Sequence, residues 1–174
     1  MKISKIDRRI LFLALSCGLI IVDQIVKAIV VAVFPSIFSS VTVIPHVLNF
    51  TYVQNHGAAF SILGGYTWLL ILLTIILLII FIYLIVSKKA QSFSNMLALS
   101  LIIAGGTGNL IDRIFRGGAV VDYIDLKFWP LDGFAIFNLA DCMVVIGTVI
   151  LIVLLLVDLF RPKKNQTDSK EMPK

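Results

Sequence analysis

The sequence predicts an all-α membrane protein with four transmembrane helices and a small extracytoplasmic β-rich subdomain. Hydrophobic residues make up 59% of the 174 residues and charged residues only 14%. The mean hydropathy of +1.03 is too high for a soluble domain of this length. Four apolar runs each approach the roughly 20 residues that a helix needs to cross the hydrocarbon layer. Most basic residues flank these runs.

The predicted spans are 11–33, 67–86, 96–114 and 138–158. Basic residues gather before the first span, between the second and third, and after the fourth. Because positively charged residues concentrate in cytoplasmic loops, both termini are expected in the cytoplasm and the segments 34–66 and 115–137 outside it. The net charge of +5 then reflects membrane topology, and no nucleic-acid partner is expected.

Residues 1–160 are expected to form a single integral-membrane domain, followed by a polar cytoplasmic tail over 161–174. The first span could instead be a removable signal peptide, because the residues before Cys17 loosely resemble a cleavage box. The apolar run continues to Val33, beyond the length of a signal-peptide core, so the span is expected to remain. Cys17 and Cys142 both fall in apolar runs, which predicts small core residues and no disulfide framework.

The outer segment 34–66 is long and only half polar, and we expect it to form short strands packed at the membrane surface. Pro35 and Pro45 disfavour helix. Residues 41–44 and 48–53 are rich in β-branched and aromatic side chains, which favour strands. A plain connector is the other interpretation of this segment.

Two charged residues fall within the first span, where a charge costs about 3 kcal/mol or more. Asp23 and Lys27 are four residues apart, so they share a helix face in the favourable order for an ion pair. We expect a structural ion pair that orients the first span in the bundle. Direct catalysis is the alternative, although it would place both groups closer to the outer surface.

The third span ends in AGGTGNLIDR, which combines small and polar residues at helical spacing. Gly105, Gly108, Asn109 and Asp112 recur at i, i+3, i+4 and i+7, so they form one stripe. A neighbouring helix is expected to approach this stripe closely and to hydrogen-bond to it. Asp112 and Arg113, near the outer end of the span, are expected to form an ion pair or a backbone cap.

Two acidic residues from separate stretches of the chain are expected to meet at the outer membrane boundary. Asp122 lies in the apolar, β-branched stretch VVDYID after the third span, and Asp141 lies at the start of the fourth. Because the third span leaves the membrane on the side where the fourth enters, the two carboxyls can approach each other. This convergence is the central prediction from the sequence.

The surroundings of these two acids predict different roles. The apolar stretch around Asp122 is expected to raise its pKa. Asp141 lies three residues after Asn138, a good N-cap, so a helix-capping role is equally open. A protonated and an ionised carboxyl side by side suit acid-base hydrolysis, in which one activates water and the other donates to the scissile carbonyl oxygen. His46 and His56 lack the partners of a catalytic triad or zinc site, so structural or surface roles are expected.

Four blocks together resemble the lipoprotein signal peptidase (signal peptidase II) family over residues 10–158. They are Asp23 and Gln24 with Lys27, YVQNHGAAF at 52–60, GNLIDR at 108–113 with VVDYID at 120–125, and FNLAD at 137–141. Any one block alone is a weak signal. Their order, spacing and placement on four spans are jointly specific.

The resemblance implies a multi-pass aspartic endopeptidase of the bacterial plasma membrane, active at the extracytoplasmic face without a metal or cofactor. Asp122 and Asp141 correspond to the family's catalytic pair, which cuts before a cysteine that already carries diacylglycerol. The expected partners are diacylglyceryl-modified prolipoproteins and membrane lipids, and a monomer is expected. Positions that match the family's substrate-binding and supporting residues are Asn55, Gly57, Ala58, Phe60, Asn109, Asp112, Arg113 and Asn138.

The residues alone leave two other function classes open. Asp112, Asp122, Asp125 and Asp141 could supply oxygen ligands for Mg²⁺ in a metal-dependent membrane enzyme such as a phosphotransferase, which a chelator would inhibit. A transporter or proton relay could use the first-span ion pair together with Asp112 as a buried charge path. Four spans without inverted repeats are untypical of a transporter.

Overall fold

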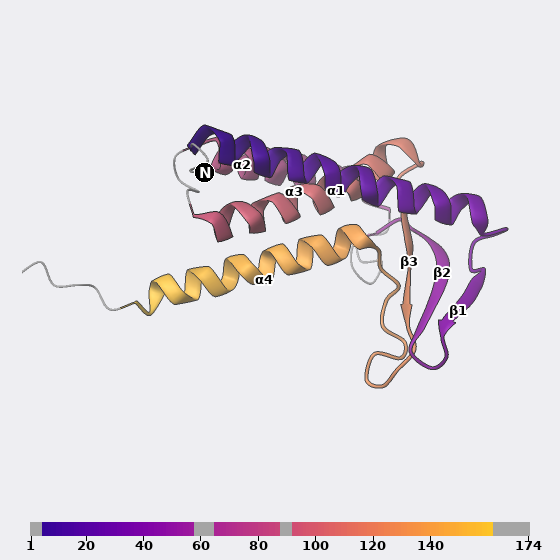
Figure 1. The fold of residues 1–174 in the computed structure, drawn as a ribbon. Coiled ribbons are helices and arrows are strands. Elements are labelled where there is room, and N and C mark those ends of the chain that lie inside the picture. Colours follow the sequence, from indigo (N-terminus) through magenta and orange to yellow (C-terminus); the bar gives the residue numbers. More distant parts are fainter. Residues whose placement is uncertain (1–4, 58–64, 88–91, 162–174) are drawn as a thin grey trace, which may run out of the picture.

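The computed structural model describes residues 5–57, 65–87 and 92–161. Four helices in these ranges are long and apolar enough to cross a membrane. They are α1 (Lys5–Val33), α2 (Thr67–Val86), α3 (Phe93–Phe115) and α4 (Leu139–Leu159) (Figure 1). The four predicted spans are confirmed as helices, and α1 begins six residues earlier than the apolar run because its polar first turns continue the same helix.

Helix α3 is the centre of the bundle, because it packs against α1, α2 and α4. Close packing depends on glycine. A Cβ atom at Gly105 would collide with the backbone oxygen of Ala140, and one at Gly147 would lie 2.6 Å from the backbone oxygen of Ala98. Small residues of this kind let two helix backbones approach in a membrane. The predicted stripe on the third span therefore faces its neighbours, as expected.

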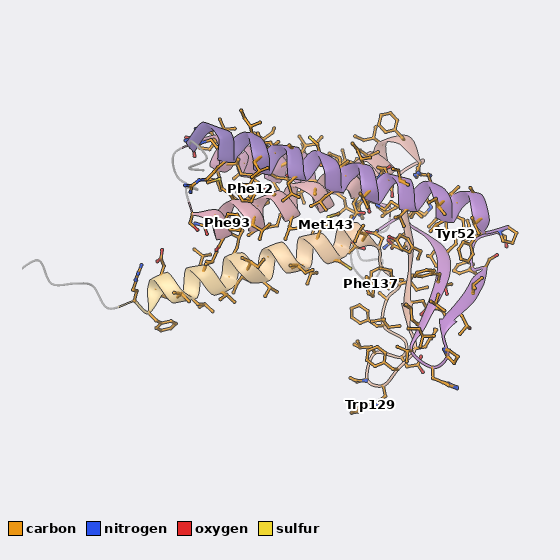
Figure 2. The ribbon with its side chains drawn as sticks, viewed as in Figure 1. Phe12, Tyr52, Phe93, Trp129, Phe137 and Met143 are labelled. Carbon is orange, nitrogen blue, oxygen red and sulfur yellow. The ribbon has the colours of Figure 1, made fainter. Side chains whose placement is uncertain are left out.

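Phe12 and Met143 are buried between the helices and make two different kinds of contact with α3. The rings of Phe12 on α1 and Phe93 on α3 meet edge to face, with their centroids 5.2 Å apart, at the end of the bundle away from the sheet (Figure 2). Met143 on α4 packs with Ala104 and Ala140 nearer the sheet. The start and the middle of α3 are thus fixed by different kinds of contact.

Outside the bundle lies a three-stranded antiparallel sheet in the order β1-β2-β3. The hairpin of β1 (Ser40–Ile44) and β2 (Leu48–Asn55) confirms the strands expected in segment 34–66. The third strand, β3 (Val120–Leu126), comes from the connection between α3 and α4. This stretch is apolar and β-branched, but its pairing with β2 to complete the sheet was not predicted from the sequence.

The sheet sits at the end of the bundle where α1 and α3 end and where α2 and α4 begin (Figure 1). Tyr52, Val121 and Tyr123 from the sheet pack against Val30 of α1. The backbone of Ile124 also exchanges hydrogen bonds with Phe137, just before α4. The sheet is thereby fixed to the helix ends, and β3 is held between them.

The structure corrects the prediction for one of the two cysteines. Cys17 is exposed on the surface of α1 and is not a core residue. Its neighbour Ser16 faces the interior, where its Oγ lies 3.1 Å from the backbone oxygen of Ser100, so the next side chain points away from the bundle. Cys142 is partly buried, and both thiols are free.

Glycine at the α3–α4 contact should be needed for stability. We expect Gly147→Ala to lower the free energy of unfolding by about 1 to 3 kcal/mol, because the new methyl group meets backbone that must shift. Thermal unfolding in detergent measures the change. Gly18→Ala is the matched control, since nothing lies within 4 Å of a Cβ there. An equal loss of stability in both variants would contradict this account of the contact.

Candidate active site

Asp122 lies on β3 opposite Val53 of β2, at the end of the sheet that meets the helices. Its side chain is buried, with 2% of the residue surface exposed. One carboxylate oxygen accepts a hydrogen bond from Asn55 Nδ2 at 3.0 Å, and the other accepts one from Asn138 Nδ2. Two amide groups from different elements therefore hold this carboxyl in place.

Asp141 lies in the first turn of α4 and forms a reciprocal capping box with Asn138. Its backbone N–H donates to Asn138 Oδ1, and its Oδ2 accepts from the backbone N–H of Asn138, each at 3.0 Å. Its other oxygen, Oδ1, accepts from Asn109 Nδ2 at 2.7 Å. The capping role considered from the sequence is confirmed, and it leaves Asp141 beside Asp122, because Asn138 is hydrogen-bonded to both.

Burial raises the pKa of Asp122 to about 7, and the negative charge of Asp141 contributes to the increase. The hydrogen bonds from Asn55 and Asn138 and the charge of Lys27 act in the opposite direction. The direction agrees with the expectation from the apolar stretch around Asp122. A carboxyl with this pKa can hold a proton near neutral pH and release it within the same range.

The two carboxyls line a cavity of about 600 Å³. Asn55, Asn109 and Arg113 also line this cavity. The remaining wall is mainly apolar and is formed by α2, α3, α4 and the segment before α4, including Leu77, Leu78, Phe81, Ile102, Phe134, Ile136, Phe137, Val144 and Val145. The arrangement suits a substrate that is hydrophobic over most of its length and polar at the reacting bond.

A buried ion cluster lies next to this site. Lys27 is 3.1 Å from Asp23 and 3.0 Å from Asp112, and all three side chains are fully buried. Asp112 also pairs with Arg116 at 3.1 Å and accepts the backbone N–H of Val121. Asp23 and Lys27 form the ion pair that their spacing predicted. Asp112 also forms ion pairs, with Lys27 and Arg116, whereas Arg113 donates to the backbone oxygens of Asn109 and Gly57.

The structure brings most of the other predicted site residues to the same place. Asn55, Asn109 and Asn138 bind the two carboxyls, as described above. Arg113 donates to the backbone oxygen of Gly57 at 3.0 Å, which connects α3 to the end of β2. The remaining two, Ala58 and Phe60, lie outside the described residues.

Sequence reasoning missed the contribution of Gln24. Its amide nitrogen lies 3.1 Å from the backbone oxygen of Gly108 and 3.3 Å from Asp112 Oδ1, so it connects α1 to α3. The only signal in the sequence was its position beside Asp23 in a block that resembled the family. A neutral amide costs less to bury in a membrane span than a charge does, so its presence alone did not predict a contact with α3.

The four acids considered as magnesium ligands do not converge. Asp125 is bound by Thr51 at 2.7 Å and by Lys127 at 3.0 Å on the sheet, and Asp112 belongs to the ion cluster. Over residues 5–57, 65–87 and 92–161, no group of three or more histidine, cysteine, aspartate or glutamate side chains could hold a metal ion. His46 and His56 are exposed, and neither lines the cavity that contains the two carboxyls.

A family model described as "Signal peptidase (SPase) II" matches residues 15–157. The chain belongs to the signal peptidase II family. It is therefore a protease of the signal peptidase II type, with the helices of a multi-pass membrane protein.

Relatives and solved structures agree with this membership. A lipoprotein signal peptidase of Halothermothrix orenii is 44% identical over 78% of this chain and 88% of its own length. One of Staphylococcus aureus strain JH9 is 39% identical over 84% of this chain and 88% of its own length. A bacterial membrane enzyme solved by the in meso method at 2.3 Å resolution superposes with a TM-score of 0.81 and 36% identity, covering 89% of this chain and 93% of that one.

Asn138 should have two separable roles, since its oxygen caps α4 and its amide nitrogen binds Asp122. We expect Asn138→Ser to keep the cap through its hydroxyl and to lose less stability than Asn138→Ala, while peptidase activity falls because the donor to Asp122 is lost. Asn138→Ala should lose activity and also about 0.5 to 2 kcal/mol of stability. Turnover and thermal unfolding measure the two effects. Full activity in the serine variant would show that the amide donor is dispensable.

Proposed function

We propose that the chain is an aspartic endopeptidase that removes signal peptides from diacylglyceryl-modified prolipoproteins by cutting before the lipidated cysteine. The observation that carries the proposal is the pair of carboxyls, Asp122 and Asp141, which share Asn138 and line a mainly apolar cavity. Membership in the signal peptidase II family and the names of the curated relatives support the substrate class.

In the proposed mechanism, Asp141 acts as general base and Asp122 as general acid. Asp141 lies at a helix N-terminus, where the side-chain amide of Asn109 and the backbone N–H of Asn138 donate to its carboxylate oxygens. It takes a proton from the water that attacks the scissile carbonyl carbon. Asp122, with its pKa raised to about 7, donates its proton to the carbonyl oxygen. The resulting gem-diol intermediate collapses when the proton on Asp141 passes to the leaving nitrogen and the Asp122 carboxylate takes back a proton from one of the two hydroxyls. The C–N bond then breaks, the C=O bond re-forms, and both aspartates return to their starting protonation states.

The apolar wall of the cavity would receive the hydrophobic part of the substrate. The signal helix and acyl chains of a lipidated precursor have few groups that can hydrogen-bond, so they fit beside α2 and α4. A cavity lined in this way also limits the number of water molecules near the reacting bond. The polar side chains of the lining, Asn55, Asn109 and Arg113, would then bind the peptide backbone around the cleavage site.

The proposal includes the orientation of the protein in the membrane. The basic residues that flank the spans favour cytoplasmic termini. With that orientation, the sheet and both carboxyls would lie on the extracytoplasmic side. Residues 1–160 would form one peptidase domain with 161–174 as a cytoplasmic tail, and the chain would act as a monomer. The scissile bond of a lipid-anchored precursor lies at the same membrane boundary.

Loss of either carboxyl should abolish processing. We expect Asp122→Asn and Asp141→Asn to leave the protein folded in the membrane and to give no shortened product from a diacylglyceryl-modified precursor. Gel mobility of the precursor measures cleavage.

Asp125→Asn is the matched control, because Asp125 lies on the same strand but binds Thr51 and Lys127 and should not be needed for turnover. EDTA should leave activity unchanged in a metal-independent reaction. Cleavage of the precursor by Asp122→Asn or Asp141→Asn would contradict the assignment of these residues as catalytic. Inhibition by EDTA would favour a metal-dependent enzyme.

Activity should decrease as the pH rises above neutral. Asp122 must be protonated to act as the acid, and its pKa is about 7, so kcat/KM should fall as the pH passes upward through this value. Asn55→Ala removes a hydrogen bond that lowers the pKa of Asp122, so this fall should move to higher pH. A pH profile of turnover checks both statements. A fall that moves to lower pH in the Asn55 variant would contradict the role given to Asp122.

A further inference from the structure

The buried ammonium group of Lys27 is connected to both carboxyls of the site through hydrogen bonds. Its three N–H donors have three acceptors: Asp23 at 3.1 Å, Asp112 at 3.0 Å and Asn109 Oδ1 at 2.9 Å. The first two contacts explain how a charge is tolerated in α1. The third is not an ion pair, and it points from the cluster toward the active site.

The contact with Lys27 determines which way the amide of Asn109 faces. An ammonium group can only donate, so the amide oxygen must face Lys27 and the amide nitrogen must face Asp141, to which it donates at 2.7 Å. The reverse orientation would place N–H groups against the ammonium and an oxygen against the carboxylate. Lys27 and Asp141 therefore select the same orientation of Asn109.

The same amide oxygen also orients the second carboxyl. Asn109 Oδ1 accepts a second hydrogen bond, from Asn138 Nδ2 at 3.2 Å, and that nitrogen also donates to Asp122. The chain of contacts runs from Lys27 through Asn109 to Asp141, and through Asn109 and Asn138 to Asp122. It crosses α1, α3, α4 and β3, and every link is a buried or partly buried hydrogen bond.

We infer that Lys27 is a positioning residue for the catalytic pair, acting through Asn109, in addition to its part in the ion cluster. The inference rests on the proposed function of Asp122 and Asp141. Without the ammonium, Asn109 loses the partner that fixes its amide, and the donors to both carboxyls can move away from their productive positions. The lost positive charge would also change the balance of charges around Asp122.

The chain offers a control that separates positioning from stability. Lys27 and Arg116 both form an ion pair with Asp112, but Arg116 is partly exposed and does not bond to Asn109. Substitution of either Lys27 or Arg116 removes one of the ion pairs of Asp112. Only substitution of Lys27 also removes the hydrogen bond to Asn109 Oδ1.

The test compares Lys27→Met with Arg116→Gln in purified full-length protein, using a diacylglyceryl-modified precursor. We expect Lys27→Met to lower kcat by about 10- to 100-fold, because small displacements of catalytic groups have effects of this size. KM should change little, since Lys27 does not line the cavity. Arg116→Gln should lower the Tm and leave kcat unchanged. The inference is overturned if both variants lose only stability.

The pH profile provides a readout that a purely structural role would not move. The charged groups that act on Asp122 are Asp141 from α4, Arg113 from α3 and Lys27 from α1. The positive charge of Lys27 lowers the pKa of Asp122, so its removal should shift the fall in activity at high pH further upward. Arg116→Gln should show no such shift. An unchanged profile in a folded Lys27 variant counts against the inference.

A second variant keeps the test decisive if Lys27→Met does not fold. Asp23→Asn combined with Lys27→Met removes one buried acid and one buried base together, so the net charge of the cluster is kept and Asp112 retains Arg116. Reduced kcat and a shifted pH profile in this folded double variant support the inference, and wild-type values overturn it. Activity in Asp122→Asn, measured in parallel, would instead overturn the proposed function itself.

Discussion

The close approach of α3 to its neighbours is the constraint on which the site depends. A Cβ atom at Gly108 would lie 2.5 Å from Asp23 Oδ2 and 3.4 Å from Ala140 Cβ, so α3 touches both α1 and α4 at this one residue. The next residue, Asn109, can therefore contact Lys27 on one side and Asp141 on the other. A larger residue at this point would separate the helices and break the hydrogen bonds between them.

The site also depends on the sheet, which holds one carboxyl at a fixed place relative to the helix ends. Asp122 is on a strand and Asp141 is on a helix, and Asn138 joins them because it both caps α4 and donates to β3. The result is an environment in which two acids have different donors and different degrees of burial. Such a difference is what allows neighbouring carboxyls to take opposite roles in proton transfer.

Much of this arrangement could be predicted from the sequence. The four spans, the ion pair of Asp23 with Lys27 and the capping box at Asn138 depend on helical periodicity and local spacing, which a single sequence shows directly. The pairing of β2 with β3 could not be predicted, because the partners are separated by two complete helices. The link from Lys27 to Asn109 was also missed, since a contact between two helices depends on their relative rotation and not on spacing within either one.

The pairing of β2 with β3 has a consequence for how the protein is made. Strand β2 is synthesised before α2 and α3, whereas its partner β3 is synthesised after them. Asp141 is synthesised later still, because it lies in the last helix, α4. Under the proposed mechanism, a nascent chain with two or three helices in the bilayer therefore lacks at least one of the two catalytic carboxyls. Proteolytic activity would then require the final helix to join the bundle, so unfinished copies would not cleave proteins that are inserted alongside them.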